Sequence, residues 1–396
     1  MLQGVLMGLL LLFLLSLGER TCAPALPDPT LEPPPWPRWV HRHWVWENSG
    51  TQESAWAFVN AFLEHEIPVG AVIIDRPWQT EPNTFVPDPA RYPDLDTLIE
   101  AFHEIDVRVF LWITSVINVG ASNYDEAKAK GYFLSNGRTI EWWGGEGSLL
   151  DYTNPAAVAW WHAQMDPILD LGIDGWKCDA TDPYVLTLVP SIGYGGQVTW
   201  EEYKDAYYRD FFDYTRSRLG DDRVITARPS DDYFVTGIPL SFAPVDVNFA
   251  GWVGDQDPDF SGLRVALSNM FTSAELGYVS YGSDIGGFRD LGERYPEAFT
   301  RWAQLGALCP IMENGGSGEH RPWAYGERIE SIYRTYTRLH YELIPYIYSQ
   351  AAYSFEIGLP TMRPQAGVWT YLLGDELLVA PFYEPGETRE IIFPEG

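Results

Sequence analysis

The chain has 396 residues, and its 26 Lys and Arg against 55 Asp and Glu give a formal net charge of −29. This charge excludes nucleic acid and anionic membrane surfaces as expected partners, because both would be repelled. A hydrophobic content of 46% excludes global disorder, and an aromatic content of 15% suits either a sugar-binding pocket or an ordinary core.

The N-terminal segment carries an apolar run at 5–17, VLMGLLLLFLLSL, which is shorter than the roughly 20 residues of a membrane-spanning helix. Its length is typical of a signal peptide. We therefore expect residues 1–23 to be a cleaved signal, or alternatively an uncleaved membrane anchor, and the protein to be secreted or periplasmic. Residues 24–38 are rich in proline and predict an extended linker, so that the folded part begins near Trp39.

Beyond the linker, short apolar runs alternate with longer segments whose apolar residues recur at helical spacing. The runs predict strands at 40–46, 70–75, 107–114, 148–151, 175–179, 223–228, 247–252 and 278–284. The longer segments predict helices at 54–65, 95–105, 156–171, 200–219, 260–276, 296–305 and 329–348.

This alternation indicates parallel strands joined by crossover helices. Eight such strands within residues 39–365 predict an α/β fold, a TIM (β/α)8 barrel with loop insertions, and a doubly wound sheet is the alternative. No GxGxxG or GxxxxGK[ST] motif follows the early strands, so a nucleotide-binding fold has no support. Strands at 376–380 and 390–393 predict that residues 366–396 begin a further unit of a longer protein.

Three cysteines, with no CxxC pair and no Cys/His cluster, predict neither a disulfide framework nor a zinc site. Cys178 and Cys309 lie in apolar contexts and are expected to be buried thiols. We expect no metal and no cofactor.

Polar residues stand where several of the predicted strands end. Because the carboxyl ends of parallel barrel strands share one rim, these side chains are candidates for an active site, although an Asp in such a place can instead cap the next helix. Many carboxylates at a rim, with abundant Trp, suggest glycoside hydrolysis, which needs two carboxyl groups beside the scissile bond. Spacing alone does not select the pair from the strand-end residues, which are Asp75, Thr114, Asp151, Asp179, Arg228 and Asp284.

Four motifs in order give the chain a more specific resemblance: GIDGWKCDATDPY at 172–184, GWVGD at 251–255, YGSDIGGF at 281–288 and RWAQLGALCP at 301–310. Together they resemble glycoside hydrolase family 31, which contains retaining α-glucosidases, α-xylosidases, α-galactosidases and sulfoquinovosidases, and some α-glucan lyases. The resemblance implies a TIM barrel followed by β-sandwich domains, so that residues 366–396 would be the first strands of a sandwich.

The resemblance also assigns the two catalytic carboxyls. The family's nucleophile is an Asp that ends a barrel strand, which matches Asp179. Its acid/base is the Asp of a Trp-X-Gly-Asp motif, which matches Asp255. Rivals for the acid are Asp257 and the pair Asp231 and Asp232.

Further substrate-binding positions are implied in the same way. Asp75 matches a carboxylate that accepts hydrogen bonds from sugar hydroxyls, and His320 matches a substrate-binding histidine. Arg228 is expected to pair with a carboxylate, and Asp284 to hold the site in place. The remaining candidates are Lys177 and the pocket-wall residues Trp112, Trp143 and Trp252, with Trp142 and Trp323 as additional possibilities.

The chain departs from the family pattern in ways that leave the sugar open. Lys177 stands where α-glucosidases commonly have an aromatic residue, and the loop ENGGSGE at 313–319 is unlike the common Arg-X-His form. We therefore expect a retaining, exo-acting α-glycosidase for an α-glucoside, α-xyloside or α-galactoside, with carbohydrate as its partner. The alternatives are a catalytically silent carbohydrate-binding barrel and an α-glucan lyase.

Overall fold

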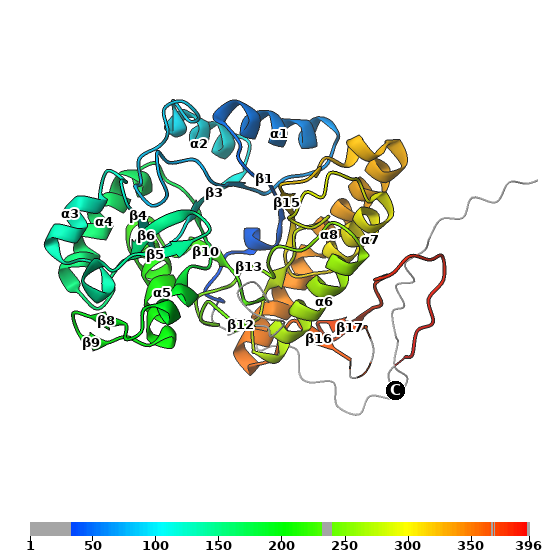
Figure 1. Cartoon of the computed structure of the whole chain (residues 1–396). Coiled ribbons are helices and arrows are strands. Elements are labelled where there is room, and N and C mark those ends of the chain that lie inside the picture. Colours follow the sequence, from blue (N-terminus) through cyan, green and yellow to red (C-terminus); the bar gives the residue numbers. More distant parts are fainter. Residues whose placement is uncertain (1–32, 232–239, 366, 368, 394–396) are drawn as a thin grey trace, which may run out of the picture.

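Eight parallel strands form the centre of the computed structural model, which describes residues 33–231, 240–365, 367 and 369–393 (Figure 1). The apolar runs that the sequence shows explain these strands, since both faces of most of them are buried. In chain order the strands are β1 (His43–Glu47), β2 (Ala71–Ile74), β3 (Arg108–Ile113), β7 (Gly175–Cys178), β10 (Val224–Ala227), β13 (Gly251–Trp252), β14 (Tyr281–Gly282) and β15 (Met312–Gly316).

The strands close into a ring. Six of them are hydrogen-bonded in the order β10-β7-β3-β2-β1-β15, and β13 pairs with β14. Parallel bridges between Ile225 and Asn248 and between Asp284 and Glu313 join the two groups. The prediction of a TIM barrel is confirmed.

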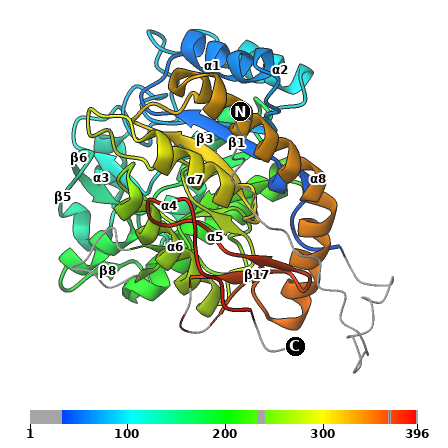
Figure 2. The ribbon, with the colours of Figure 1, turned by 90° about the vertical axis from the view of Figure 1, so that its right-hand side faces the viewer.

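Helices cover the outside of the barrel, with α1 and α2 above it in Figure 1, α4 and α5 on one side, and α6, α7 and α8 on the other. Figure 2 shows that α8 runs along the full height of the molecule. Side-chain caps fix where several helices begin; the Thr51 hydroxyl completes a capping box at the start of α1, and the Thr199 hydroxyl does so at the start of α5. The helices are α1 (Gln52–Glu64), α2 (Leu95–Glu104), α3 (Tyr124–Lys130), α4 (Pro155–Leu169), α5 (Trp200–Leu219), α6 (Phe260–Glu275), α7 (Pro296–Gly306) and α8 (Glu327–Ile357), with short 3-10 turns η1 (Arg38–His41), η2 (Leu134–Gly137), η3 (Asp182–Thr187) and η4 (Pro322–Tyr325).

The predicted loop insertions are small antiparallel sheets. They consist of β4 (Val116–Asn118), β5 (Ile140–Trp142) and β6 (Gly145–Leu149), of β8 (Ile192–Gly193) with β9 (Gly196–Gln197), and of β11 (Ser230–Asp231) with β12 (Leu240–Ser241).

One predicted barrel strand was wrong. The run at 148–151 overlaps β6 in an inserted sheet, and the Asp151 carboxylate accepts hydrogen bonds from Thr153 and from the Tyr194 backbone. The eighth barrel strand is β15, whose polar and glycine-rich sequence carries no strand pattern. It forms because it is held between β1 and β14.

The C-terminal part packs a three-stranded antiparallel sheet beside the barrel, made of β16 (Met362–Pro364), β17 (Tyr371–Leu373) and β18 (Leu377–Val379). Tyr371 donates a hydrogen bond to the Leu308 carbonyl at 2.9 Å, which ties this sheet to the segment that follows α7. The strand expected at 390–393 is absent; those residues have no regular structure.

The N-terminal signal or anchor at 1–23 lies outside the described residues. The end of the predicted linker is packed rather than free, because Trp36 is buried and stacks on Phe249 with ring centroids 4.8 Å apart. Cys178 and Cys309 are buried free thiols, as expected. Within the described ranges no helix combines the length and apolarity needed to cross a membrane.

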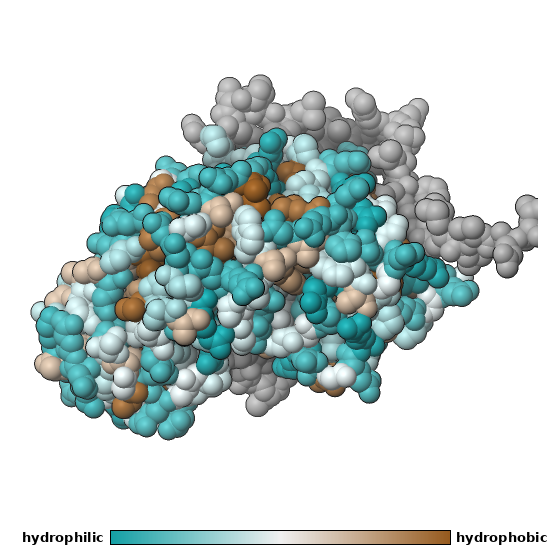
Figure 3. Space-filling model, turned by 90° about the horizontal axis from the view of Figure 1, so that it is seen from above, coloured by the Kyte–Doolittle hydropathy of each residue, from teal (hydrophilic) through white to brown (hydrophobic). Residues whose placement is uncertain are grey.

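The face that carries α1 and α2 is mostly hydrophilic, with hydrophobic residues in small groups (Figure 3). This agrees with the strong net negative charge of the chain.

Candidate active site

The carboxyl ends of the barrel strands converge on one group of charged side chains. Asp75 follows β2, Asp179 follows β7, Arg228 follows β10 and Asp284 follows shortly after β14. Trp252 is the last residue of β13, so that distant parts of the sequence meet at a single rim.

Of the two predicted catalytic carboxyls, Asp179 is the more enclosed: 13% of its side chain is exposed, against 22% for Asp255. Its Oδ1 accepts hydrogen bonds from Arg228 Nε at 3.1 Å and from the Ala180 backbone N–H at 2.8 Å. Its Oδ2 accepts one from Trp112 Nε1 at 3.2 Å. These donors fix the orientation of the carboxylate.

The same contacts set its charge. Burial acts to raise the pKa of Asp179, but the positive charges of Arg228 and Lys177 outweigh burial. The pKa therefore lies below its ordinary value, and Asp179 is ionised at neutral pH.

Arg228 joins three carboxylates. Its Nη2 lies 3.0 Å from each oxygen of Asp255, its Nε contacts Asp179, and its Nη1 contacts Asp231. The guanidinium is almost fully buried, with 1% exposed, whereas 22% of the Asp255 side chain is exposed. One planar cation thus contacts both Asp179 and Asp255, and Asp255 is the more exposed of the two carboxylates.

Gly254 explains the glycine of the Trp-X-Gly-Asp motif. It has a positive φ of 95°, and a Cβ atom at this position would lie 2.3 Å from the Asp231 carboxylate. Only glycine lets the chain pass so close to this charged group before turning to place Asp255.

Lys177 and Asp75 form a buried ion pair, with Nζ and Oδ2 2.8 Å apart. The ammonium lies 3.3 Å from the ring centre of Trp46 and 5.0 Å from that of Trp252. Burial acts to lower the pKa of Lys177, but Asp75 and two further carboxyls, those of Asp284 and Glu313, raise it above its usual value. Lys177 is therefore a permanent cation in the floor of the site.

Asp284 is fully buried and accepts a hydrogen bond from Trp46 Nε1 at 3.2 Å. Its bridge partner on β15, Glu313, is 1% exposed. Burial raises the pKa of both carboxyls, that of Glu313 to about 7.

The predicted aromatic walls differ in exposure. Trp112 and Trp252 are buried beside the charged groups, whereas Trp143 is 41% exposed and meets Trp112 edge-on at 5.7 Å. The Arg76 guanidinium lies 4.9 Å from the Trp143 ring. Trp143 is thus an exposed aromatic ring that reaches Asp179 through Trp112.

The other candidates have different partners. His320 is buried, with Nδ1 3.1 Å from the Ile285 carbonyl oxygen and from Asn314 Oδ1, and burial lowers its pKa to about 4. Trp323 stacks on His65, the residue that follows α1. Asp257 pairs with Arg289 near the surface, and Asp232 lies outside the described residues.

Three residues of the site were missed by sequence reasoning: Trp46, Asp231 as a partner of Arg228, and Glu313. Trp46 ends an apolar run, which predicts a core residue. Glu313 begins the segment 313–319, which predicts a loop, and only the departure of this segment from the family's Arg-X-His form pointed to it.

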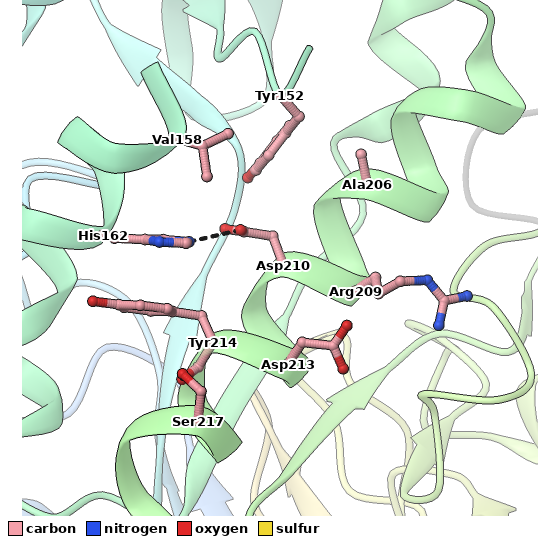
Figure 4. A pocket seen from close by; sticks show the side chains of 9 residues that line it. All are labelled: Tyr152, Val158, His162, Ala206, Arg209, Asp210, Asp213, Tyr214 and Ser217. Carbon is pink, nitrogen blue, oxygen red and sulfur yellow. Dashed lines mark hydrogen bonds and ion pairs between the residues drawn. The ribbon is translucent and has the colours of Figure 1, made fainter. Parts of the chain in front are cut away.

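A separate hollow lies outside the barrel between α4 and α5, with a volume of about 460 Å³ (Figure 4). His162 Nε2 lies 2.7 Å from Asp210 Oδ1 there, and the His162 ring stacks on Tyr214. None of the predicted site residues lines it.

In the part of the chain that the structure describes, no group of three or more His, Cys, Asp or Glu could hold a metal ion.

Comparison with known proteins identifies the family. Residues 33–350 match the family described as the glycosyl hydrolases family 31 TIM-barrel domain. The chain belongs to glycosyl hydrolase family 31. The resemblance seen in its motifs is thereby confirmed.

Among curated proteins, the family 31 chain is similar to the alpha-xylosidase XylQ of Lactiplantibacillus pentosus, with 28% identity over 91% of this chain and 49% of the relative. It is also similar to alpha-glucosidase 2 of Bacillus thermoamyloliquefaciens, with 26% identity over 92% of this chain and 48% of the relative. The chain thus spans about half the length of these relatives.

Solved structures share the fold. A GH31 alpha-xylosidase from a soil metagenome, complexed with xylose, superposes with a TM-score of 0.76 at 22% identity, over 89% of this chain and 57% of that one. The Flavobacterium johnsoniae GH31 dextranase, complexed with glucose, gives 0.76 at 21% identity, over 90% and 47%.

Proposed function

We propose that this family 31 chain forms the catalytic barrel of a retaining, exo-acting α-glycoside hydrolase, with Asp179 as nucleophile and Asp255 as acid/base. The observation that carries the proposal is the bridge made by Arg228, whose one guanidinium contacts both carboxylates. A retaining mechanism needs its two carboxyl groups close together, about 5–5.5 Å apart, and a shared guanidinium favours such a spacing.

The first step of the reaction forms a covalent intermediate. The Asp179 carboxylate attacks the anomeric carbon, and the bond from this carbon to the leaving oxygen breaks. Asp255 transfers its proton to that oxygen, so that the leaving group departs as an alcohol. An ionised Asp179 is what this step requires, and its lowered pKa supports the assignment.

The second step reverses the roles. Asp255, now a carboxylate, takes a proton from water while the water oxygen attacks the anomeric carbon and frees Asp179. To reach the leaving oxygen and the water, one Asp255 oxygen must turn from Arg228 toward the substrate. Its 22% exposure supports this role, because the rival Asp231 is only 1% exposed.

The substrate is proposed to be an α-glucoside, α-xyloside or α-galactoside bound by its non-reducing end. Asp75, held by Lys177, would accept hydrogen bonds from sugar hydroxyls, and Trp143 offers an exposed ring at the edge of the site. The names of the relatives, an alpha-xylosidase and an alpha-glucosidase, support the first two sugars.

The test is a release assay with p-nitrophenyl α-glucoside, α-xyloside and α-galactoside, comparing the wild type with Asp179→Ala. We expect release from one sugar in the wild type and loss of turnover, by about 10⁴-fold or more, in the variant. Release that survives in Asp179→Ala would contradict the proposed nucleophile. No release by a folded wild type from any of the three would favour a silent barrel.

A further inference from the structure

Asp284 and Glu313 are brought together by the closure of the barrel. Asp284, two residues beyond β14, forms a parallel bridge with Glu313 on β15, so their side chains leave the sheet on the same side. Their exposed fractions are 0% and 1%. Two acidic groups therefore lie next to each other out of reach of solvent.

The donors around this pair are too few for two full negative charges. Trp46 Nε1 donates to Asp284 Oδ1, whereas Asp284 Oδ2 and Glu313 Oε1 are buried without a hydrogen-bond partner. The nearest cation, Lys177, already donates to Asp75 at 2.8 Å. One ammonium thus faces three buried carboxyls, and neighbouring buried carboxyls do not both ionise under such conditions.

We propose that Asp284 and Glu313 share one proton beneath the active site, and that Glu313 is a positioning residue whose neutral or shared-proton state keeps Lys177 on Asp75. A protonated carboxyl can donate a hydrogen bond to its ionised neighbour, and this bond would pair the two oxygens that otherwise have no partner. Its loss would place a second negative charge beside Lys177, in competition with Asp75.

The charged surroundings agree with this assignment. Asp284 is faced by Glu313, Lys177, Asp255 and Arg228, and burial with the Glu313 charge raises its pKa. Glu313 is faced by Lys177, Trp46 and Asp75; burial raises its pKa to about 7, with Lys177 opposing. The proton would therefore be held in mildly acidic and neutral solution.

The first test measures stability and does not depend on activity. The folded chain keeps a proton on Glu313 up to about pH 7, whereas the unfolded chain loses it near the ordinary value of 4.5. Wild-type stability should thus lose a contribution as pH rises through this window. In Glu313→Gln that loss is absent, so the melting temperature of the variant relative to wild type should rise between about pH 4.5 and 7 and then level off.

Glu319→Gln is the matched control, because Glu319 lies in the loop after the same strand but pairs with Arg321 at the surface. Its melting temperature relative to wild type should not rise over that window. A pH-independent difference for Glu313→Gln would overturn the shared proton. If that variant does not fold, infrared spectra of the wild type decide: a protonated-carboxyl band that titrates near pH 7 supports the proposal, and its absence at pH 6 overturns it.

The second test rests on the proposed function. It measures the pH dependence of kcat/KM to test whether Glu313 positions Lys177. A Gln amide mimics a permanently protonated Glu313, so the alkaline limb of kcat/KM should move to higher pH in Glu313→Gln, while the limb in Glu319→Gln stays in place. An unmoved limb in Glu313→Gln would overturn the positioning role. An inactive wild type would contradict the proposed function alone, because the stability and infrared tests stand without it.

Discussion

At the scale of single residues, the site depends on Arg228. A buried guanidinium is costly to desolvate unless its donors are used, and here Asp179, Asp231 and Asp255 use them. The planar, always charged group suits this role better than lysine would, since its N–H donors point in fixed directions. The arrangement keeps Asp179, the proposed nucleophile, ionised and holds Asp255, the proposed acid/base, beside it.

Asp255→Ala tests the acid/base at this scale. The variant lacks the proton donor but keeps Asp179, so natural glycosides should lose about 10²–10⁴-fold in kcat/KM, and substrates with good leaving groups far less. The measurement is kcat/KM on a disaccharide and on an aryl glycoside of the same sugar.

Asp257→Ala serves as its control, because Asp257 pairs with Arg289 and is 38% exposed. It should leave both substrates nearly unaffected. Equal losses on both substrates in Asp255→Ala, or a selective loss in Asp257→Ala, would move the acid/base role away from Asp255.

The charged residues that meet at the rim were largely predictable, since Asp75, Asp179, Arg228 and Asp284 stand at the ends of predicted strands. Their contacts were not predictable, because a sequence does not show that Arg228 contacts both Asp179 and Asp255 or that His320 binds to Ile285 and Asn314.

At the scale of elements, the turn after β13 is shaped by two features at once: the positive φ of Gly254 and the closeness of the Asp231 carboxylate. A side chain there strains the backbone and also pushes Asp231 off Arg228. A substitution at Gly254 should therefore lower activity more than a substitution at a glycine that has only the positive φ.

Gly254→Ala should lower kcat/KM by about 100-fold. The backbone must move to relieve the contact with Asp231, and a displacement of Asp255 by about 1 Å is enough for such a loss. Gly120→Ala is the matched control: Gly120 also has a positive φ, of 89°, but nothing lies within 4 Å of its Cβ position. Both variants place a side chain at a left-handed backbone position, but Gly254→Ala should lose more thermal stability, because its Cβ also meets the Asp231 carboxylate. Only Gly254→Ala should lose activity. Equal activity in the two variants would contradict this account of the motif.

Element prediction failed at β15 and at 148–151 for one reason. Periodicity reports the burial of a segment but not its neighbours, so a buried apolar run in an inserted sheet resembles a barrel strand. A strand rich in Glu, Asn and Gly is recognised only when β1 and β14 are in place to bind it.

At the scale of the whole molecule, buried histidines join the amino ends of the barrel strands to α8. His41 Nδ1 lies 2.9 Å from the Pro310 carbonyl oxygen, and His340 Nε2 lies 2.7 Å from that of His41. Burial lowers the pKa of His41 from 6.5 to about 4. The folded chain therefore holds His41 neutral where the unfolded chain would bind a proton.

Stability should consequently fall in acid. As pH drops from about 6.5 to about 4, His41 alone should remove on the order of 3 kcal/mol from the unfolding free energy. His41→Gln should be less stable at pH 7 but show a shallower decline, measured by denaturant unfolding at several pH values. His65→Gln, at a partly exposed ring, is the control; an unchanged slope in His41→Gln would contradict the assignment.

The sequence by itself determined the α/β barrel, its family and the strand-end position of most charged side chains. These follow from local patterns: apolar runs of strand length, helical spacing between them, and short motifs. Only the tertiary structure decided the eighth strand, the bridge of Arg228 between Asp179 and Asp255, and the pairing of Asp284 with Glu313. The reason is physical: these contacts exist only once strands far apart in the chain close into a ring, and burial within that ring sets which carboxyls carry charge.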